Sequence, residues 1–184
     1  MTAHTGRAFA ATAAPAAGDG ARLESIVIRP SRGERVTLDE VRLDPAFGVE
    51  GDDWATRGSR MTADGGADPE CQVTLINVRV LEAIEPDRSR WPLAGDQLLV
   101  DLDLSVEALP PGSRISIGSV VLEMSAAPHT GCASFSARFG SDALRWINTP
   151  EGRAQRRRGA NARVVRAGSV RAGDPIRIAA EEVP

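Results

Sequence analysis

Cys132 has the most distinctive chemistry in the sequence, because it closes the run Pro128-His129-Thr130-Gly131-Cys132 directly after a stretch of strand-forming residues. A thiol at the end of a strand becomes nucleophilic when a cation or a helix N-terminus stabilises its thiolate. Arg138, His129 and the helix expected after this run are all close in sequence. We therefore predict a reactive cysteine, with His129 orienting or deprotonating the thiol.

Each of these residues also has an ordinary structural explanation. Free cysteine is among the most buried residue types, so Cys132 could simply fill the core. His129 could equally stabilise a turn. The only other histidine is His4, in an expected tail, so a closed tetrahedral zinc site is not expected. The sequence contains no G-x-S-x-G elbow that would indicate a serine hydrolase.

Three further segments could contribute polar groups to a site. Asp52 in the loop Gly48–Asp53 and the pair Gly95-Asp96 combine a glycine with a carboxylate, which usually serves a turn. They gain functional interest only if both loops meet the cysteine loop in space. The segment Arg156–Arg163, with Arg158 and Asn161, could bind an anion or form a solvated charged loop.

Composition narrows the class of protein. The 184 residues carry a net charge of -3 and are 42% hydrophobic, which indicates one globular domain and argues against disorder or general nucleic-acid binding. Lysine is absent from the sequence. A covalent pyridoxal phosphate adduct is therefore not expected, because it needs a lysine amine.

The two cysteines, Cys71 and Cys132, are too few for a disulfide framework and favour a reducing compartment, although one bridge between them stays open. We therefore expect a cytoplasmic protein. No run of about 20 apolar residues that could span a membrane is present. The alanine-rich start lacks a leucine-like apolar run, so residues 1–21 are expected to be a disordered tail rather than a secretion signal.

Residues 22–180 are expected to form a single, mostly β domain. Alternating or β-branched runs predict strands, and two short helices are predicted: one over 78–84, capped by Asn77 and ended before Pro86, and one over 138–148. The expected strands lie at 23–29, 35–38, 41–43, 71–76, 96–103, 115–124, 162–165, 169–171 and 175–178. Many short strands separated by glycine turns favour a barrel or a sandwich.

Seven elements in a fixed order resemble the MOSC domain, the family related to the C-terminal domain of molybdenum cofactor sulfurase. The resemblance covers nearly all of the chain beyond the tail and suggests a stand-alone, bacterial-type member. The seven elements are the strand Leu23–Arg29, the loop Gly48–Asp52, the strand Gln72–Ile76, the strand Ile117–Glu123, the segment His129–Cys132, the run Arg158–Val165 and the run Gly168–Asp174.

The resemblance implies a MOSC-type β-barrel with a few short helices, in which Cys132 faces a pocket that handles sulfur or the molybdenum cofactor. Cys132 would accept sulfane sulfur as a persulfide or ligate molybdenum. A cysteine desulfurase or a molybdoenzyme is the partner implied. The expected catalytic residues are Cys132 and His129, and the expected cofactor-binding residues are Asp52, Thr130, Arg138, Arg158 and Asn161.

Alternatives remain open at this point, including whether the chain is an enzyme. With molybdenum cofactor bound it could reduce N-hydroxylated compounds. It could instead be a barrel that binds an anionic or purine-like small molecule, or a purely structural protein. Two departures from the family concern the substrate: Asp101–Ser105 replaces an Asn-Leu pair, and Thr130-Gly131 replaces a frequent proline. Pyridoxal phosphate, where associated with the family, would belong to a partner.

Overall fold

The computed structural model describes residues 8–59 and 62–179. Its strands are β1 (Arg22–Ile28), β2 (Val36–Leu38), β3 (Glu40–Asp44), β4 (Gly48–Val49), β5 (Val73–Asn77), β6 (Leu98–Asp101), β7 (Arg114–Ile117), β8 (Val120–Met124), β9 (Ala160–Arg166), β10 (Gly168–Arg171) and β11 (Ile176–Ile178). Its helices are α1 (Trp54–Arg57), α2 (Val78–Ile84), α3 (Ala133–Phe139), α4 (Ser141–Ile147) and α5 (Pro150–Ala154), with the 3-10 helices η1 (Pro69–Cys71) and η2 (Arg88–Ala94).

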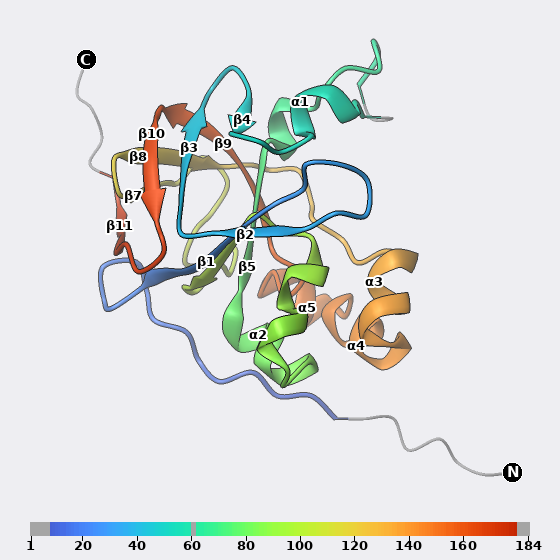
Figure 1. The fold of residues 1–184 in the computed structure, drawn as a ribbon. Coiled ribbons are helices and arrows are strands. Elements are labelled where there is room, and N and C mark those ends of the chain that lie inside the picture. The colour runs from blue at the N-terminus through green and yellow to red at the C-terminus, as the bar shows by residue number, and fades with distance from the viewer. Residues whose placement is uncertain (1–7, 60–61, 180–184) are drawn as a thin grey trace, which may run out of the picture.

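The expected mostly β fold is confirmed. One curled sheet of eight strands has the order β11-β7-β8-β9-β5-β6-β1-β2, and a smaller sheet has the order β10-β3-β4. All neighbouring strands pair antiparallel except β5 and β6, which are parallel. A parallel pair needs a crossover between its strands. Here the crossover consists of α2 and η2, which brings the end of η2 to the site described below (Figure 1).

Two hydrophobic cores hold the fold together. The first fills the interior of the curled sheet with fully buried side chains such as Leu23, Leu75 and Leu122. The second lies between the sheet and the helices, where Ile76 of β5 and Phe135 of α3 belong to the same buried cluster. Strand β5 therefore serves both cores, and α3 is fixed to the sheet through the second.

The helical segment after β8 differs from the sequence prediction. Two helices, α3 and α4, replace the single helix expected over 138–148. Gly140 separates them with a backbone φ of 91°, a left-handed conformation that residues other than glycine rarely adopt. A further short helix, α5, follows α4 and was not predicted. Figure 1 shows α3, α4 and α5 gathered on one side of the sheet together with α2.

Residues 8–20, part of the segment expected to be a tail, lie against the domain. The ring of Phe9 packs on Trp146 of α4 with centroids 5.5 Å apart. The guanidinium of Arg79 donates to the carbonyl of Ala13, and the N–H of Gly18 donates to Ile176 of β11 at 2.8 Å. This segment therefore runs from α4 to β11, an edge strand of the large sheet.

The described helices are short. Within residues 8–59 and 62–179, none has both the length and the hydrophobicity required to cross a membrane.

The predicted cap of α2 gives the first testable outcome. The side chain of Asn77 accepts a hydrogen bond from the N–H of Arg79 at 2.8 Å, as expected from the sequence. Nδ2 of Asn77 also donates to the carbonyl of Leu102 at 2.9 Å. Replacing Asn77 by alanine leaves both the N–H and this carbonyl without their partner, so the free energy of unfolding should fall by about 1 to 2 kcal/mol. Urea denaturation measures the change, and Asn77→Asp, which retains a capping oxygen but cannot donate to Leu102, should recover only part of it. Equal stability of Asn77→Ala and the parent would contradict this role.

Candidate functional site

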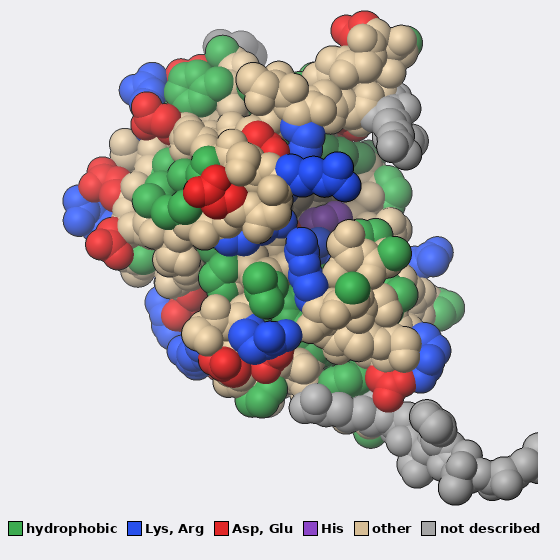
Figure 2. Space-filling model, turned by 45° about the vertical axis from the view of Figure 1, so that its right-hand side comes forward, with side chains coloured by type: hydrophobic (Ala, Val, Ile, Leu, Met, Phe, Trp, Pro, Cys, Tyr) green, Lys and Arg blue, Asp and Glu red, His purple; other side chains and the backbone are tan. Residues whose placement is uncertain are grey.

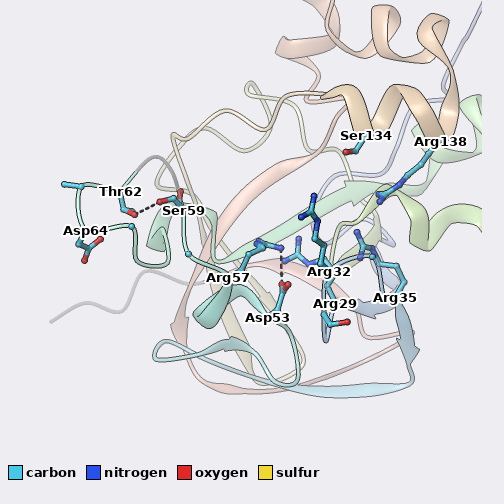
Figure 3. A pocket seen from close by; sticks show the side chains of 15 residues that line it. Arg29, Arg32, Arg35, Asp53, Arg57, Ser59, Thr62, Asp64, Ser134 and Arg138 are labelled. Carbon is cyan, nitrogen blue, oxygen red and sulfur yellow. Dashed lines mark hydrogen bonds and ion pairs between the residues drawn. The ribbon is translucent and has the colours of Figure 1, made fainter.

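An open, polar cavity of about 1080 Å³ lies beside α3, and five of the fifteen residues that line it are arginine. Figure 3 shows these arginines converging from three segments of the chain, and Figure 2 shows blue arginine side chains gathered around a hollow in the surface. The arginines are Arg29, Arg32, Arg35, Arg57 and Arg138. Asp53 and Asp64 are the only acidic residues that line the cavity among the described residues. The cavity therefore has an excess of positive charge.

The end of η2 fixes three arginines through its main chain. Three successive carbonyl oxygens each accept a hydrogen bond from a different guanidinium. Arg138 donates to Leu93 at 2.7 Å, Arg158 to Ala94 at 3.1 Å, and Arg29 to Gly95 at 3.1 Å. The last carbonyls of a helix lack partners within the helix, so they are natural acceptors for cationic donors.

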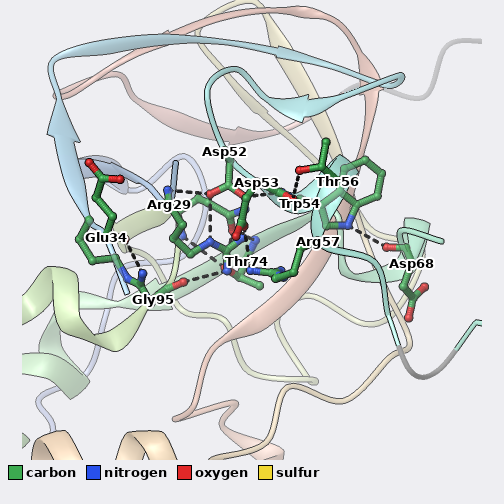
Figure 4. A network of polar contacts seen from close by, with 12 residues as sticks. Arg29, Glu34, Asp52, Asp53, Trp54, Thr56, Arg57, Asp68, Thr74 and Gly95 are labelled. Atoms are coloured by element: carbon green, nitrogen blue, oxygen red, sulfur yellow. Dashed lines mark hydrogen bonds and ion pairs between the residues drawn. The ribbon is translucent and has the colours of Figure 1, made fainter. Parts of the chain in front are cut away.

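Asp52 anchors Arg29 at the floor of the cavity (Figure 4). Its carboxylate is fully buried and receives both Nε and Nη2 of Arg29 at 2.9 Å. It also accepts the N–H of Arg29 at 2.9 Å, the N–H of Trp54 at 3.0 Å and the amide of Gln97 at 3.3 Å. A buried charge is tolerated when paired and fully hydrogen-bonded, as here. Asp52 is thus an anchor for an arginine rather than a group open to a ligand.

Asp96 anchors Arg158 in the same manner, one residue after the carbonyl of Gly95. The buried carboxylate of Asp96 accepts Nη1 of Arg158 at 2.7 Å, and the guanidinium lies 5.1 Å from the centre of the Phe135 ring. Phe135 belongs to the first turn of α3. This contact places a fixed positive charge beneath the helix that begins after Cys132.

Arg35 carries charge that is not neutralised locally. Its Nε is buried without a hydrogen-bond partner, and its Nη1 donates to the main chain of Glu34 at 2.5 Å. Burial, then the positive charges of Arg138 and Arg29, lower the pKa of Arg35. Mutually repelling, partly desolvated guanidinium groups are stabilised by any anion that enters between them. The cavity therefore suits a phosphate or another multiply charged oxyanion.

Cys132 is exposed and occupies the N-cap position of α3. Burial raises the pKa of its thiol, but the N–H groups of Phe135 and Ser134 and the positive charge of Arg158 lower it, and the pKa falls below its ordinary value. A lower pKa increases the fraction of reactive thiolate near neutral pH. Ser134 and Arg138, on the same helix, line the arginine cavity. The thiol is therefore held at the border of the cavity.

Cys71 differs from Cys132 in exposure and in the direction of its pKa shift. Both cysteines are free, so the bridge between them left open by the sequence is not formed. Burial, followed by the negative charges of Asp68 and Glu70, raises the pKa of Cys71 to about 11. Cys71 is accordingly a protonated thiol near neutral pH.

His129 lies against the buried carboxylate of Asp96. Its Nδ1 lies 3.4 Å from the Asp96 carboxylate, just beyond a good hydrogen bond. Burial and the nearby charge of Arg158 lower the pKa of His129 to about 4 despite the opposing effect of Asp96. The imidazole is therefore neutral at pH 7, and His129 is not among the groups that shift the pKa of Cys132.

The other expected site residues divide between two cavities and the scaffold. Arg138 lines the arginine cavity, whereas Thr130 and Arg158 line a second, smaller cavity. Asn161, buried in β9, donates to the carbonyl of Ala127 at 3.1 Å and so holds the loop before Cys132. The loops of Asp52 and Asp96 do meet near the cysteine loop, the condition under which they would gain functional interest.

Sequence reasoning missed Arg29, Arg32, Arg35 and Arg57. A signal for the first three was present, because the run Arg29–Arg35 carries three arginines at a strand end and in the turn after it. Such a run also occurs in solvated loops. Only the contact of Arg29 with Asp52 and Gly95 distinguishes the two situations.

The fold and the site together define a mostly β domain with an arginine-lined cavity next to a thiol of lowered pKa. Residues 67–177 match the model of the MOSC domain, and because they span more than half of the chain, the protein belongs to the MOSC domain family. Family membership associates the chain in general terms with handling of the molybdenum cofactor. No curated protein matches the sequence significantly.

Several solved structures share the fold. The YuaD protein of Bacillus subtilis superposes with a TM-score of 0.63 at 18% identity, covering 85% of this chain and 93% of YuaD. YiiM of Geobacillus stearothermophilus gives 0.57 at 15% identity, with 89% and 77% covered. YiiM of Escherichia coli gives 0.57 at 17% identity, with 89% and 72% covered. These likenesses support the MOSC fold.

The two cysteines should differ in reactivity. Alkylation by iodoacetamide, followed by mass spectrometry of each cysteine peptide over a pH series, should show Cys132 reacting with a midpoint below that of an ordinary cysteine. Cys71 should stay largely unmodified at neutral pH. Ser134 also donates its side chain to the sulfur, so Ser134→Ala should move the Cys132 midpoint upward. Ser136→Ala, on the same helix, is the matched control. Similar midpoints for the two cysteines would contradict the electrostatic description of Cys132.

Stability should depend on pH through His129. Its pKa is about 4 when folded, against 6.5 for an ordinary histidine, so between these values the unfolded chain binds more protons. The free energy of unfolding should therefore fall as the pH decreases from 6.5 to 4, by on the order of 3 kcal/mol. Urea unfolding across this window measures the slope. His129→Gln should flatten it, and an unchanged slope in that variant would refute the assignment.

Proposed function

We propose that this protein handles sulfur or the molybdenum cofactor, with Cys132 accepting sulfane sulfur as a persulfide or ligating molybdenum. The observation that carries the proposal is the position of Cys132: an exposed thiol of lowered pKa, on a helix whose Ser134 and Arg138 line an arginine cavity. The thiolate is both the nucleophile for sulfur transfer and the form that binds a metal. The arginines supply the binding site for an anionic partner molecule.

The sulfur-transfer step needs only a persulfide donor. The Cys132 thiolate attacks the outer sulfur of the donor, a new S–S bond forms at Sγ, and the donor's S–S bond breaks to release its thiolate. The fixed charge of Arg158 and the N–H groups of Ser134 and Phe135 stabilise the attacking thiolate and then the persulfide anion. A second thiolate can receive the same sulfur by the reverse exchange, attacking the outer sulfur and releasing the Cys132 thiolate.

The residues present fit an anionic pterin cofactor. The unpartnered Nε of Arg35 and the arginines around it leave positive charge for a phosphate group. Arg32, Arg35 and Arg138 would hold that group, and Cys132 would be the metal ligand. When bound, the cofactor would supply two-electron reduction of compounds such as N-hydroxylated ones. The chain's own residues would bind and orient it, with Arg29 held in place by Asp52.

A protein partner follows from the same chemistry. A cysteine desulfurase could deliver sulfur to the exposed thiol, or a molybdoenzyme could receive the product. Pyridoxal phosphate, where required, would be bound covalently by that partner, because this chain has no lysine.

The carrier role predicts a specific mass change. Incubation with glutathione persulfide, followed by intact-mass measurement, should show a gain equal to one sulfur atom that dithiothreitol reverses. Cys132→Ser should abolish the gain, because the remaining Cys71 is protonated and raised in pKa. Cys71→Ser is the matched control and should retain it. A gain that survives Cys132→Ser, or no gain in the parent protein, would argue against the carrier role.

A small-molecule binding barrel is the second candidate. It is favoured by one observation, that Cys132 itself is not among the residues that line the arginine cavity. In that case the cavity binds its anion without covalent chemistry. The mass measurement separates the two functions, because a binding barrel shows no sulfur gain that depends on Cys132.

A further inference from the structure

The loop that leads to Cys132 lines a second cavity, of about 290 Å³. It is bounded by residues 125–130, by α5 and the start of β9, and by Val106. None of its lining residues lines the arginine cavity. The second cavity is therefore a separate compartment, and residues 128–130 form its wall on the side of the cysteine loop.

The charged side chains that line the second cavity are all positive. Arg153, Arg156 and Arg158 line it, whereas no aspartate or glutamate does. Arg156 donates to the carbonyls of Leu104 at 3.2 Å and Leu109 at 2.7 Å, which orient its guanidinium without neutralising it. Within residues 8–59 and 62–179, neither Arg153 nor Arg156 forms an ion pair with a carboxylate. Two guanidinium charges thus remain uncompensated.

One buried donor in this cavity lacks an acceptor. The side chain of Arg158 is only 9% exposed, and its Nε has no hydrogen-bond partner. Nδ1 of His129 is also buried, but it faces Oδ1 of Asp96 at 3.4 Å. Buried polar groups of native proteins are nearly always hydrogen-bonded, so each exception calls for an explanation. In addition, the backbone φ of Arg156 is 45°, a conformation that is strained for residues other than glycine.

The remaining walls are apolar. Val106, Pro111, Pro128, Ile147 and Ala160 line the cavity between the charged groups. Apolar walls with a few convergent polar groups are typical of sites for small organic molecules. A fully hydrated inorganic ion would gain little from such walls, whereas an organic anion would use both parts of the surface.

We propose that this second cavity is a binding site for a small organic carboxylate, with its charge at Arg153 and Arg156, next to the unpartnered Nε of Arg158, and its apolar body against Pro111, Pro128 and Ile147. Guanidinium groups match a carboxylate in geometry and charge. The site is distinct from the arginine cavity and does not require the Cys132 thiol. Its occupancy is consequently independent of the proposed sulfur chemistry.

Benzoate is a suitable probe because it combines a carboxylate with a rigid apolar ring. Titration followed by two-dimensional amide NMR should give saturable shifts in residues 125–130 and 152–160. Benzyl alcohol, of similar shape but uncharged, should not produce these shifts, and inorganic phosphate should instead shift residues 32–35 of the arginine cavity. Benzoate and benzyl alcohol binding equally well would show a purely apolar pocket and overturn the proposal.

Substitutions locate the site. Arg153 is exposed, so Arg153→Gln should fold normally and weaken benzoate binding by about tenfold, the loss expected for one charge-assisted hydrogen bond. Val106→Glu, at a residue 42% exposed, should weaken it by charge repulsion. Arg145→Gln, on α4 and outside both cavities, is the matched control and should leave the affinity unchanged.

Two outcomes would overturn the proposal: absence of saturable benzoate binding, or binding that is lost in Arg32→Gln and retained in Arg153→Gln. The latter places benzoate in the arginine cavity. Cys132→Ser should leave benzoate affinity unchanged. Failure of the sulfur-transfer experiment and failure of this one are therefore distinguishable, since they depend on different residues and different readouts.

Discussion

The arrangement of the site depends on three successive carbonyl oxygens, those of Leu93, Ala94 and Gly95, each of which accepts a hydrogen bond from a different arginine. The arginines come from α3, from the segment before β9 and from the residue after β1. A short helix end, with its unpaired carbonyls, thus joins three distant parts of the chain. Gly95 permits the turn at this point through a φ of 87°, and Asp96 follows at once to pair with Arg158.

Two buried carboxylates make this concentration of arginine tolerable. Asp52 neutralises Arg29 and Asp96 neutralises Arg158, and both carboxylates are fully buried. Removing either partner alone would leave an uncompensated buried charge, which is strongly destabilising. Arg57 pairs with Asp53 at 3.1 Å, whereas Arg32, Arg35 and Arg138 form no ion pair with a carboxylate of the described residues and leave the cavity positively charged. Arginine therefore has two roles here. The arginines paired with a buried aspartate hold the structure together, and those without one are available to an anion.

The fold itself is shared by proteins of low sequence identity, since structures only 15 to 18% identical superpose on it. The parallel pair of β5 and β6 is central, because its crossover places η2 beside the loop between β8 and α3. Cys132 lies at the end of that loop, and Asn161 of β9 holds the loop from behind. The sheet therefore positions the thiol, and its pKa is lowered by N–H groups of α3 and by Arg158, whose guanidinium the end of the crossover holds.

Much of this protein was readable from local sequence. The strands, the Asn77 cap of α2 and the distinctive position of Cys132 follow from short-range patterns, because strand periodicity and capping involve neighbouring residues. The break at Gly140 was also local but was missed: glycine is tolerated inside helices, and only the backbone conformation shows that this one separates two helices.

The charges and side-chain directions at the site depend on contacts between residues that are far apart in the sequence. Nothing near Arg29 or Arg158 in the sequence distinguishes an arginine buried against an aspartate from one in solvent. His129, three residues from Cys132, turned out to face Asp96, because the direction of a loop side chain depends on what packs around it. Sequence alone determined a mostly β chain with one unusual cysteine. The tertiary structure determined which charges surround that cysteine, since electrostatic environment depends on distances in space rather than along the chain.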